Sequence, residues 1–472
     1  MAETATDIRD LIRADRTQPD SAAVAHIVAG VLFLAVGSVA ALLSLLSATF
    51  PSFIPLGFGL WRAIAMLGLL LGFATLTVTG GAYYVLPRLT GAPLWNEKLA
   101  WVGLVLVGGS AALGMIVVGA GLGDGGEPFG LPWWLDLPVL VGLAIPAVVA
   151  LQTLRRRVEP RTFVTVYGAV TGLMVLPLTY VVGNVPGLNP IAGVIGDSFS
   201  GAAHVTMVLL VALALVDYAV VKETGQPLAG RQLTQIAYWS LLFGAGWYGI
   251  AQLLGGPVPV WLGTVGAVLG LGLPVAAVAA TANLLATLRK GWGVDEPDPV
   301  AMMAVAGAGI AVVVSVLASL AGFRSTGNLV ALTSYWEGIT FGFTLGALPL
   351  LIGAATIQAL PRMTGRSLIS VDGARRTVKR ISIGAAGLVG FLVIAGLVTG
   401  YSWAGGSFTG AFAAVGEGWA AATGPARIFL GLATVFGVVS VAGTLSLFSL
   451  ITRTLTQGRV TTQEVLVTLE EA

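Results

Sequence analysis

Long apolar segments recur along the whole chain and restrict it to one class of fold. A helix needs roughly 20 consecutive apolar residues to cross the hydrocarbon of a membrane. Only 10% of the residues are charged, whereas ordinary soluble domains carry about 25%. The sequence therefore predicts an all-α integral membrane protein that lies in the lipid bilayer. Twelve segments meet the requirement: 23–47, 60–86, 99–121, 134–152, 163–183, 202–221, 233–254, 260–287, 301–322, 333–360, 381–402 and 426–451.

The basic residues predict how these spans are oriented. Of the 24 Lys and Arg residues, 21 flank alternate ends of the spans, and the exceptions are Arg62, Arg324 and Arg427. Cytoplasmic loops carry the excess of positive charge, so both termini are expected in the cytoplasm. We expect a polar leader at 1–22, a twelve-span bundle at 23–452, a tail at 453–472 and residence in the cell (plasma) membrane. The net charge of +2 indicates no nucleic-acid partner.

Two of the predicted spans end in the same six-residue pattern. Residues 58–91 and 335–365 each form a long apolar run that closes with Leu-Pro-Arg-x-Thr-Gly. Both stretches resemble the heme-bearing helices of heme-copper oxidase subunit I, above all those of the cbb-type and nitric oxide reductase branch. The resemblance extends over nearly the whole chain and implies the twelve-helix bundle of that family. Internal repeats are also common in transporters, so the pairing alone does not separate an oxidase from a carrier.

The family's metal ligands are histidines, and this chain has other residues where the motifs place them. In the second span, Phe58-Gly59-x-x-Arg62 resembles a family pattern that ends in the low-spin heme histidine, which falls on Ala65. In the tenth span, residues 335–341 resemble the pattern W-x-x-G-H-x-H, and its two heme ligands fall on Ile339 and Phe341.

The copper ligands of the family are similarly replaced. Residues 247–252 resemble the pattern W-x-G-x-H-H, so the paired copper histidines fall on Ala251 and Gln252. The remaining copper histidine falls near Gly201, about one helical turn from His204. A small gap in the alignment would place His204 itself at the ligand position. The alternative is a hydrogen-bonded histidine near the end of its helix.

The donor chemistry of these positions argues against the family's metal sites. The family would carry two hemes and one copper, held by six histidines, whereas this chain has two histidines, His26 and His204. Hydrocarbon side chains offer no lone pair to iron or copper. The chain has no cysteine, so thiolate ligands and covalent c-type heme are excluded. We therefore expect no bound heme or copper.

Three functions remain open from the sequence. The first is a cytochrome c oxidase subunit I-like membrane protein of a respiratory complex, a non-catalytic paralogue that holds a second respiratory subunit or a redox partner. The second is a carrier or channel for a small apolar molecule or quinone in the vacated heme cavity. The third is the terminal oxidase activity that the family would imply.

The resemblance also predicts how the bundle is packed. The second, sixth, seventh and tenth spans should surround the centre, with Ala65, Ala251, Gln252, Ile339 and Phe341 pointing inward. Since an apolar void is costly, aromatic side chains should fill the former heme space, and the available ones are Phe341, Phe343, Trp247 and Tyr248. Arg62 and Glu337, near the outer ends of their helices, should either pair or face water. His26 should lie at the membrane interface.

Overall fold

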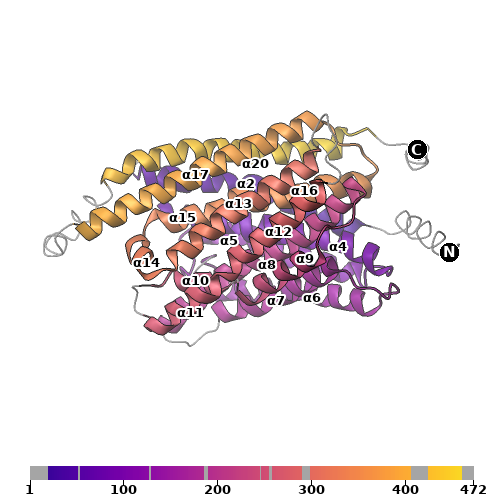
Figure 1. The fold of residues 1–472 in the computed structure, drawn as a ribbon, viewed down its shortest axis with the longest axis horizontal. Coiled ribbons are helices and arrows are strands. Elements are labelled where there is room, and N and C mark those ends of the chain that lie inside the picture. The colour runs from indigo at the N-terminus through magenta and orange to yellow at the C-terminus, as the bar shows by residue number, and fades with distance from the viewer. Residues whose placement is uncertain are drawn as a thin grey trace.

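The computed structural model describes a helical bundle over residues 20–51, 54–126, 129–184, 190–244, 246–254, 258–289, 298–405 and 424–459, without the side chains of 190–192 and 403–405 (Figure 1). Its helices are α2 (Ser21–Thr49), α3 (Phe58–Met66), η1 (Leu67–Thr75), α4 (Leu76–Thr90), α5 (Glu97–Gly119), α6 (Trp133–Arg155), α7 (Val164–Gly183), α8 (Pro190–Thr224), α9 (Arg231–Gly244), α10 (Trp247–Ala251), α11 (Val260–Gly270), α12 (Gly272–Arg289), α13 (Pro299–Ala321), α14 (Arg324–Val330), α15 (Ser334–Phe341), η2 (Gly342–Ala347), α16 (Leu348–Thr364), α17 (Val371–Gly405), η3 (Gly424–Ala426) and α20 (Arg427–Gln457).

Within the described residues, eleven helices are long and apolar enough to cross a membrane. The predicted span at 233–254 is the exception, because it is divided into α9 and the short α10. Glycine explains the close packing at this break. A Cβ on Gly244 would lie 2.7 Å from the carbonyl oxygen of Leu269, so the end of α9 lies directly against the backbone where α11 ends.

Three long helices form the centre of the bundle. In the most apolar stretch of each span we compare the share of residues that are buried. This share is 94% in Phe58–Thr90, 89% in Gly193–Thr224 and 100% in Ser334–Thr364. In the other spans it is 33–56%. The first is built from α3, η1 and α4, and the third from α15, η2 and α16. The short α10 packs against α8 as well. For the described residues, the predicted central position is thus confirmed for the second, sixth and tenth spans. In the seventh span α10 packs against a central helix, whereas α9 lies mainly at the periphery, with Trp239 51% and Phe243 67% exposed.

The repeated Leu-Pro-Arg-x-Thr-Gly pattern is a helix-ending module. In α4 the Thr90 hydroxyl donates to the Leu86 carbonyl, and Gly91 closes the helix with φ at 66°. In α16 the Thr364 hydroxyl donates to the Leu360 carbonyl, and Gly365 has φ at 64°. A glycine without a Cβ adopts this left-handed conformation at little cost, so it is the usual residue just after a helix.

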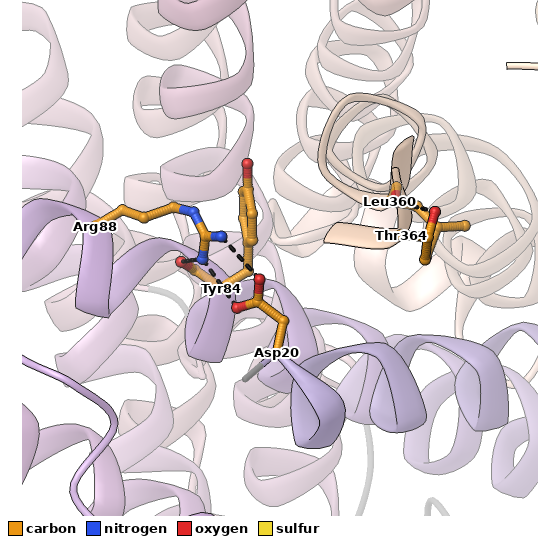
Figure 2. A network of polar contacts seen from close by, with 5 residues as sticks. All are labelled: Asp20, Tyr84, Arg88, Leu360 and Thr364. Atoms are coloured by element: carbon orange, nitrogen blue, oxygen red, sulfur yellow. Dashed lines mark hydrogen bonds and ion pairs between the residues drawn. The ribbon is translucent and has the colours of Figure 1, made fainter. Parts of the chain in front are cut away.

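Each module also directs its arginine back onto its own helix. The Arg88 guanidinium donates to the Tyr84 carbonyl and forms a two-pronged ion pair with Asp20, which precedes α2 (Figure 2). Arg362 donates to the Gln358 carbonyl and pairs with Glu223 of α8. Positive charge at a helix C-terminus is favourable because it opposes the helix dipole. The two modules therefore tie the C-terminal ends of α4 and α16 to the start of α2 and to α8.

The described chain begins and ends at the same end of the bundle (Figure 1). Asp20 pairs with Arg88 there, and the Ser367 backbone amide, just beyond the second module, donates to the Arg459 carbonyl after α20. Most of the Lys and Arg residues flank the predicted spans at this same end of the bundle.

Candidate functional site

Both helices that resemble heme-bearing helices change from α to π geometry just after the replaced ligand positions. The π segment η1 begins at Leu67, two residues after Ala65, and η2 begins at Gly342, directly after Phe341. The two π segments pack against each other in the centre. Such segments are rare, and they occur frequently at functional sites. The backbone of both helices therefore departs from α geometry next to the positions where the resemblance places the family's ligands.

The replaced positions lie in the packed interior. Ala65 and Phe341 are 0% exposed, Ile339 1% and Ala251 2%, which confirms that these four side chains point inward. Gly201 and Gln252 are half-buried, and Gln252 lines an outer cavity instead of the core. The inward direction predicted for Gln252 is therefore not confirmed, since Gln252 follows the last residue of α10 and is only half-buried.

An ion pair aligns the two π-containing helices. Arg62 Nε lies 2.7 Å from Glu337 Oε1, and each side chain is 18% exposed. Arg62 precedes Ala65 by three residues and Glu337 precedes Phe341 by four. At about 1.5 Å of rise per residue, both replaced heme positions therefore lie roughly 5 Å further into the bundle than the ion pair. Of the two alternatives that the sequence leaves open for these charges, pairing is the one that the structure shows.

Aromatic side chains occupy the region around the replaced ligands. Phe341 and Phe343 are fully buried, and the ring of Phe343 lies 6.5 Å from that of Tyr248. Trp247 is half-buried and packs edge-on against Phe199 at 5.5 Å. Among the described cavities, none has Ala65, Ile339 or Phe341 in its lining. This burial agrees with the expected filling of the space by aromatic side chains.

His204 lies well inside a helix, not near its end. Helix α8 begins at Pro190, and the His204 side chain is 2% exposed, with its Nε2 atom 2.8 Å from the Thr75 hydroxyl. Thr75 donates its only proton to the Leu70 carbonyl, five residues earlier in the π segment, so the His204 Nε2–H must donate to Thr75. The position differs from the prediction because α8 extends further outward than its apolar segment indicated.

His26 is also buried within the protein, close to the start of α2, and its position at the membrane interface stays a prediction. Its side chain is 1% exposed, its Nδ1 atom lies 2.7 Å from the Ala22 carbonyl oxygen, and its ring packs edge-on against Tyr83. His26 touches Tyr83 and His204 touches Thr75, which are eight residues apart on one helix. That separation is about 12 Å. Two imidazoles on one metal ion require bonds of roughly 2 Å each, so the two histidines cannot share an ion.

Open space remains outward of the replaced ligands. Two cavities, of about 610 and 630 Å³, share a wall formed by Gly57, Phe58, Arg62 and Glu337. The larger cavity is also lined by Gln252 and by residues at the outer ends of α2, α15, α17 and α20. Side chains thus fill the interior at the depth of Ala65 and Phe341, whereas cavities are present about one helical turn further out.

Comparison with known proteins gives the family. A sequence profile described as "Cytochrome C and Quinol oxidase polypeptide I" matches residues 21–419. The chain belongs to this oxidase polypeptide I family. It is 25% identical over 329 residues to cytochrome c oxidase subunit 1 of Rhodobacter capsulatus, covering 66% of this chain and 61% of that protein. It is 24% identical to a cytochrome c oxidase subunit 1 homolog of Agrobacterium tumefaciens (strain T37), covering 66% and 60%.

The fold of the oxidase polypeptide I family is also found in this chain. A heme-copper terminal oxidase, solved as a dimer by cryo-electron microscopy, matches with a TM-score of 0.77 and 14% identity, covering 92% of this chain and 84% of that one. In sequence, the chain spans about 61% and 60% of the length of the two curated relatives. Family and fold are therefore shown, and both agree with the resemblance found in the sequence.

The residues of this family member do not fit two hemes and a copper ion. Four of the six aligned ligand positions carry hydrocarbon side chains buried among protein atoms, namely Ala65, Ala251, Ile339 and Phe341. In the part of the chain that the structure describes, no three His, Cys, Asp or Glu residues lie together as metal ligands would. Imidazole is the nitrogen donor that suits iron and copper in proteins, and neither buried histidine has a second imidazole beside it.

Proposed function

We propose that the protein is a non-catalytic paralogue of cytochrome c oxidase subunit I, a membrane subunit that binds neither heme nor copper. The observation that carries the proposal is the complete burial of Ala65 and Phe341 among apolar side chains. An axial ligand needs a lone pair, and the ring of a heme needs space on both sides of the iron. In this chain, neither is present at that depth.

The proposed role follows from the family and the intact scaffold. The relatives are described as subunits of cytochrome c oxidases, so we propose that this chain packs against a second respiratory subunit or a redox partner protein. The family's terminal oxidase activity would require a ligand set that these residues do not supply. We therefore assign the chain to the pseudoenzymes of the family.

The decisive experiment is an optical spectrum of the purified protein with metal analysis. The chain is purified from membranes of cells grown with heme precursor and copper, and a heme protein of known content is treated in parallel. We expect no Soret band, less than one heme or copper per chain, and no oxygen or nitric oxide reduction. Stoichiometric heme with a bis-imidazole spectrum would refute the proposal, because His26 and His204 lie too far apart to hold one iron.

We further propose that the chain crosses the plasma membrane twelve times, with both termini in the cytoplasm. The gathering of basic residues at one end of the bundle supports this orientation. The chain has no cysteine, so single cysteines report on sidedness without background. In intact cells, a membrane-impermeant maleimide should label Leu122→Cys and leave Arg157→Cys unlabelled until the membrane is opened. The reverse pattern would show that the orientation is wrong.

A second candidate function is the carriage or binding of a small apolar molecule or quinone. The two outer cavities favour it, since cavities of this size are within the usual range of ligand sites, roughly 300–1,000 Å³. Passage through the bundle at the depth of the replaced ligands is disfavoured by the packing of Phe341 and Ile339. Binding at the outer end is therefore favoured over transport through the former heme space.

A further inference from the structure

We propose that the larger outer cavity binds a small uncharged amphipathic molecule, whose polar head accepts or donates a hydrogen bond at Ser47. This inference deepens the second candidate function and rests on it, because it names the ligand class that the cavity suits. It does not depend on the absence of heme, which the optical spectrum tests separately.

The cavity has an apolar wall and a few polar groups. Side chains of Phe58, Trp336, Leu392 and Leu430 contribute apolar and aromatic surface. Polar lining comes from serine and threonine hydroxyls and from the Gln252 amide. This combination is typical of ligand sites, in which apolar surface provides most of the affinity and a few polar groups fix the orientation.

Ser47 is the polar group that most clearly indicates a ligand. Its side chain is 2% exposed, it lines the cavity, and its hydroxyl has no hydrogen-bond partner in the described part of the protein. Buried polar atoms nearly always have a partner, so a hydroxyl that lacks one and lies beside a cavity is available to a polar group of a ligand. A hydroxyl or carbonyl group on a ligand would satisfy Ser47.

The charges at the cavity favour a neutral ligand. Arg62 and Glu337 both line it, and their ion pair leaves no net charge on its wall. A carboxylate ligand would have to compete with Glu337 for Arg62, and an ammonium ligand would have to compete with Arg62 for Glu337. An uncharged head group leaves the pair intact.

Strained backbone occurs at the rim of the same cavity. Leu332, one of the lining residues, has φ at 57° and is 90% exposed, and Leu56, just before the lining residue Gly57, has φ at 63°. They precede α15 and α3, the two helices that Arg62 and Glu337 join. Leucine rarely adopts this conformation, and such strain is concentrated at ligand clamps and switch regions.

The test uses photoreactive diazirine analogues of 1-dodecanol and dodecanoate, which share a tail and differ in head charge. The full-length protein in phosphatidylcholine nanodiscs is labelled over a range of concentrations, and the labelled peptides are mapped by mass spectrometry. We expect saturable labelling by the alcohol at the end of α2 and at 332–337, with the carboxylate several-fold weaker. Labelling that does not saturate, maps elsewhere, or is as strong with the carboxylate would overturn the proposal.

Two variants make the test specific. Ser47→Ala should weaken alcohol labelling roughly threefold to tenfold, the usual worth of one hydrogen bond. Ser44→Ala is the matched control. Ser44 lies on the same helix as Ser47, is buried and has no hydrogen-bond partner in the described part of the protein, but it does not line the cavity. Equal effects of the two variants would refute the role of Ser47.

The second variant, Glu337→Gln, removes the negative charge beside Arg62 and keeps the shape of the side chain. We expect it to strengthen carboxylate labelling several-fold and to leave alcohol labelling nearly unchanged. If head-group preference stays the same in Glu337→Gln protein that elutes as a single species, the charge argument is wrong.

Discussion

The two helix-ending modules allow a measurement of how burial changes the contribution of an ion pair to the free energy of unfolding. Arg88 and Arg362 occupy the same place in the same sequence pattern, and each donates to the carbonyl four residues earlier. The Arg88–Asp20 pair is 10% and 12% exposed, whereas the Arg362–Glu223 pair is 40% and 28% exposed. Replacing each arginine by glutamine therefore changes the same chemistry in two environments.

The expected losses differ several-fold. Removing one partner from a buried ion pair costs about 3–5 kcal/mol, because the other charge stays buried without its partner. The Arg88 guanidinium also lies 3.8 Å from the centre of the Tyr84 ring, an arrangement worth about 0.5–2 kcal/mol. Residual exposure reduces the sum, so we expect Arg88→Gln to lower the free energy of unfolding by about 3 kcal/mol. Arg362→Gln should lower it by less than about 1 kcal/mol.

The assay is unfolding by increasing amounts of a denaturing detergent, monitored by the circular dichroism of the helices. Asp20→Asn and the Arg88→Gln/Asp20→Asn double variant complete a double-mutant cycle. The cycle isolates the pairwise energy from the loss of the cation–π contact. Equal losses at Arg88 and Arg362, or a coupling energy near zero between Arg88 and Asp20, would refute the argument from burial.

Two further predictions concern the centre of the bundle. The Ala65→His/Phe341→His double variant should bind no stoichiometric heme and should unfold more easily than either single variant, because it adds bulk at one fully buried site and replaces an apolar phenyl ring by a smaller, polar imidazole at another. A bis-imidazole Soret band would show that the pocket persists. Gly68→Ala should cost about 1–3 kcal/mol in the same unfolding assay, since its Cβ would lie 2.5 Å from Gly37 Cα. Gly59→Ala, with open space around it, is the control and should be neutral or stabilising; equal losses would contradict the packing argument.

The sequence predicted the parts of the fold that depend on composition and on short motifs. The length of the apolar segments located eleven of the spans. A single segment that crosses a bilayer has to form a helix, because only then are its backbone hydrogen bonds satisfied without water. The motifs located the central helices and placed Ala65, Ile339 and Phe341 in the interior. The Arg62–Glu337 pair was one of two options in the sequence, because charges near helix ends can face water equally well.

Other features depend on three-dimensional contacts that one sequence does not reveal. The break between α9 and α10 arises where Gly244 meets the backbone of a neighbouring helix. His26 is interior because its Nδ1–H reaches a carbonyl of its own helix and Tyr83 covers its ring. Ser47 was missed as a candidate because a serine in an apolar run usually indicates helix packing. Only the cavity beside it indicates a ligand.

The π segments mark the two places in the centre of this protein where a one-residue deletion is best tolerated. Each π turn holds one residue more than an α-helical turn. Deleting one residue between Leu67 and Thr75 would let the segment relax to α geometry while the rest of the helix keeps its orientation, so Arg88 would still face Asp20. The same deletion in the α-helical part between Leu76 and Tyr84 would turn every later side chain by about 100° and carry Arg88 away from Asp20. A length polymorphism would therefore be less damaging inside η1 than in the helix that follows it.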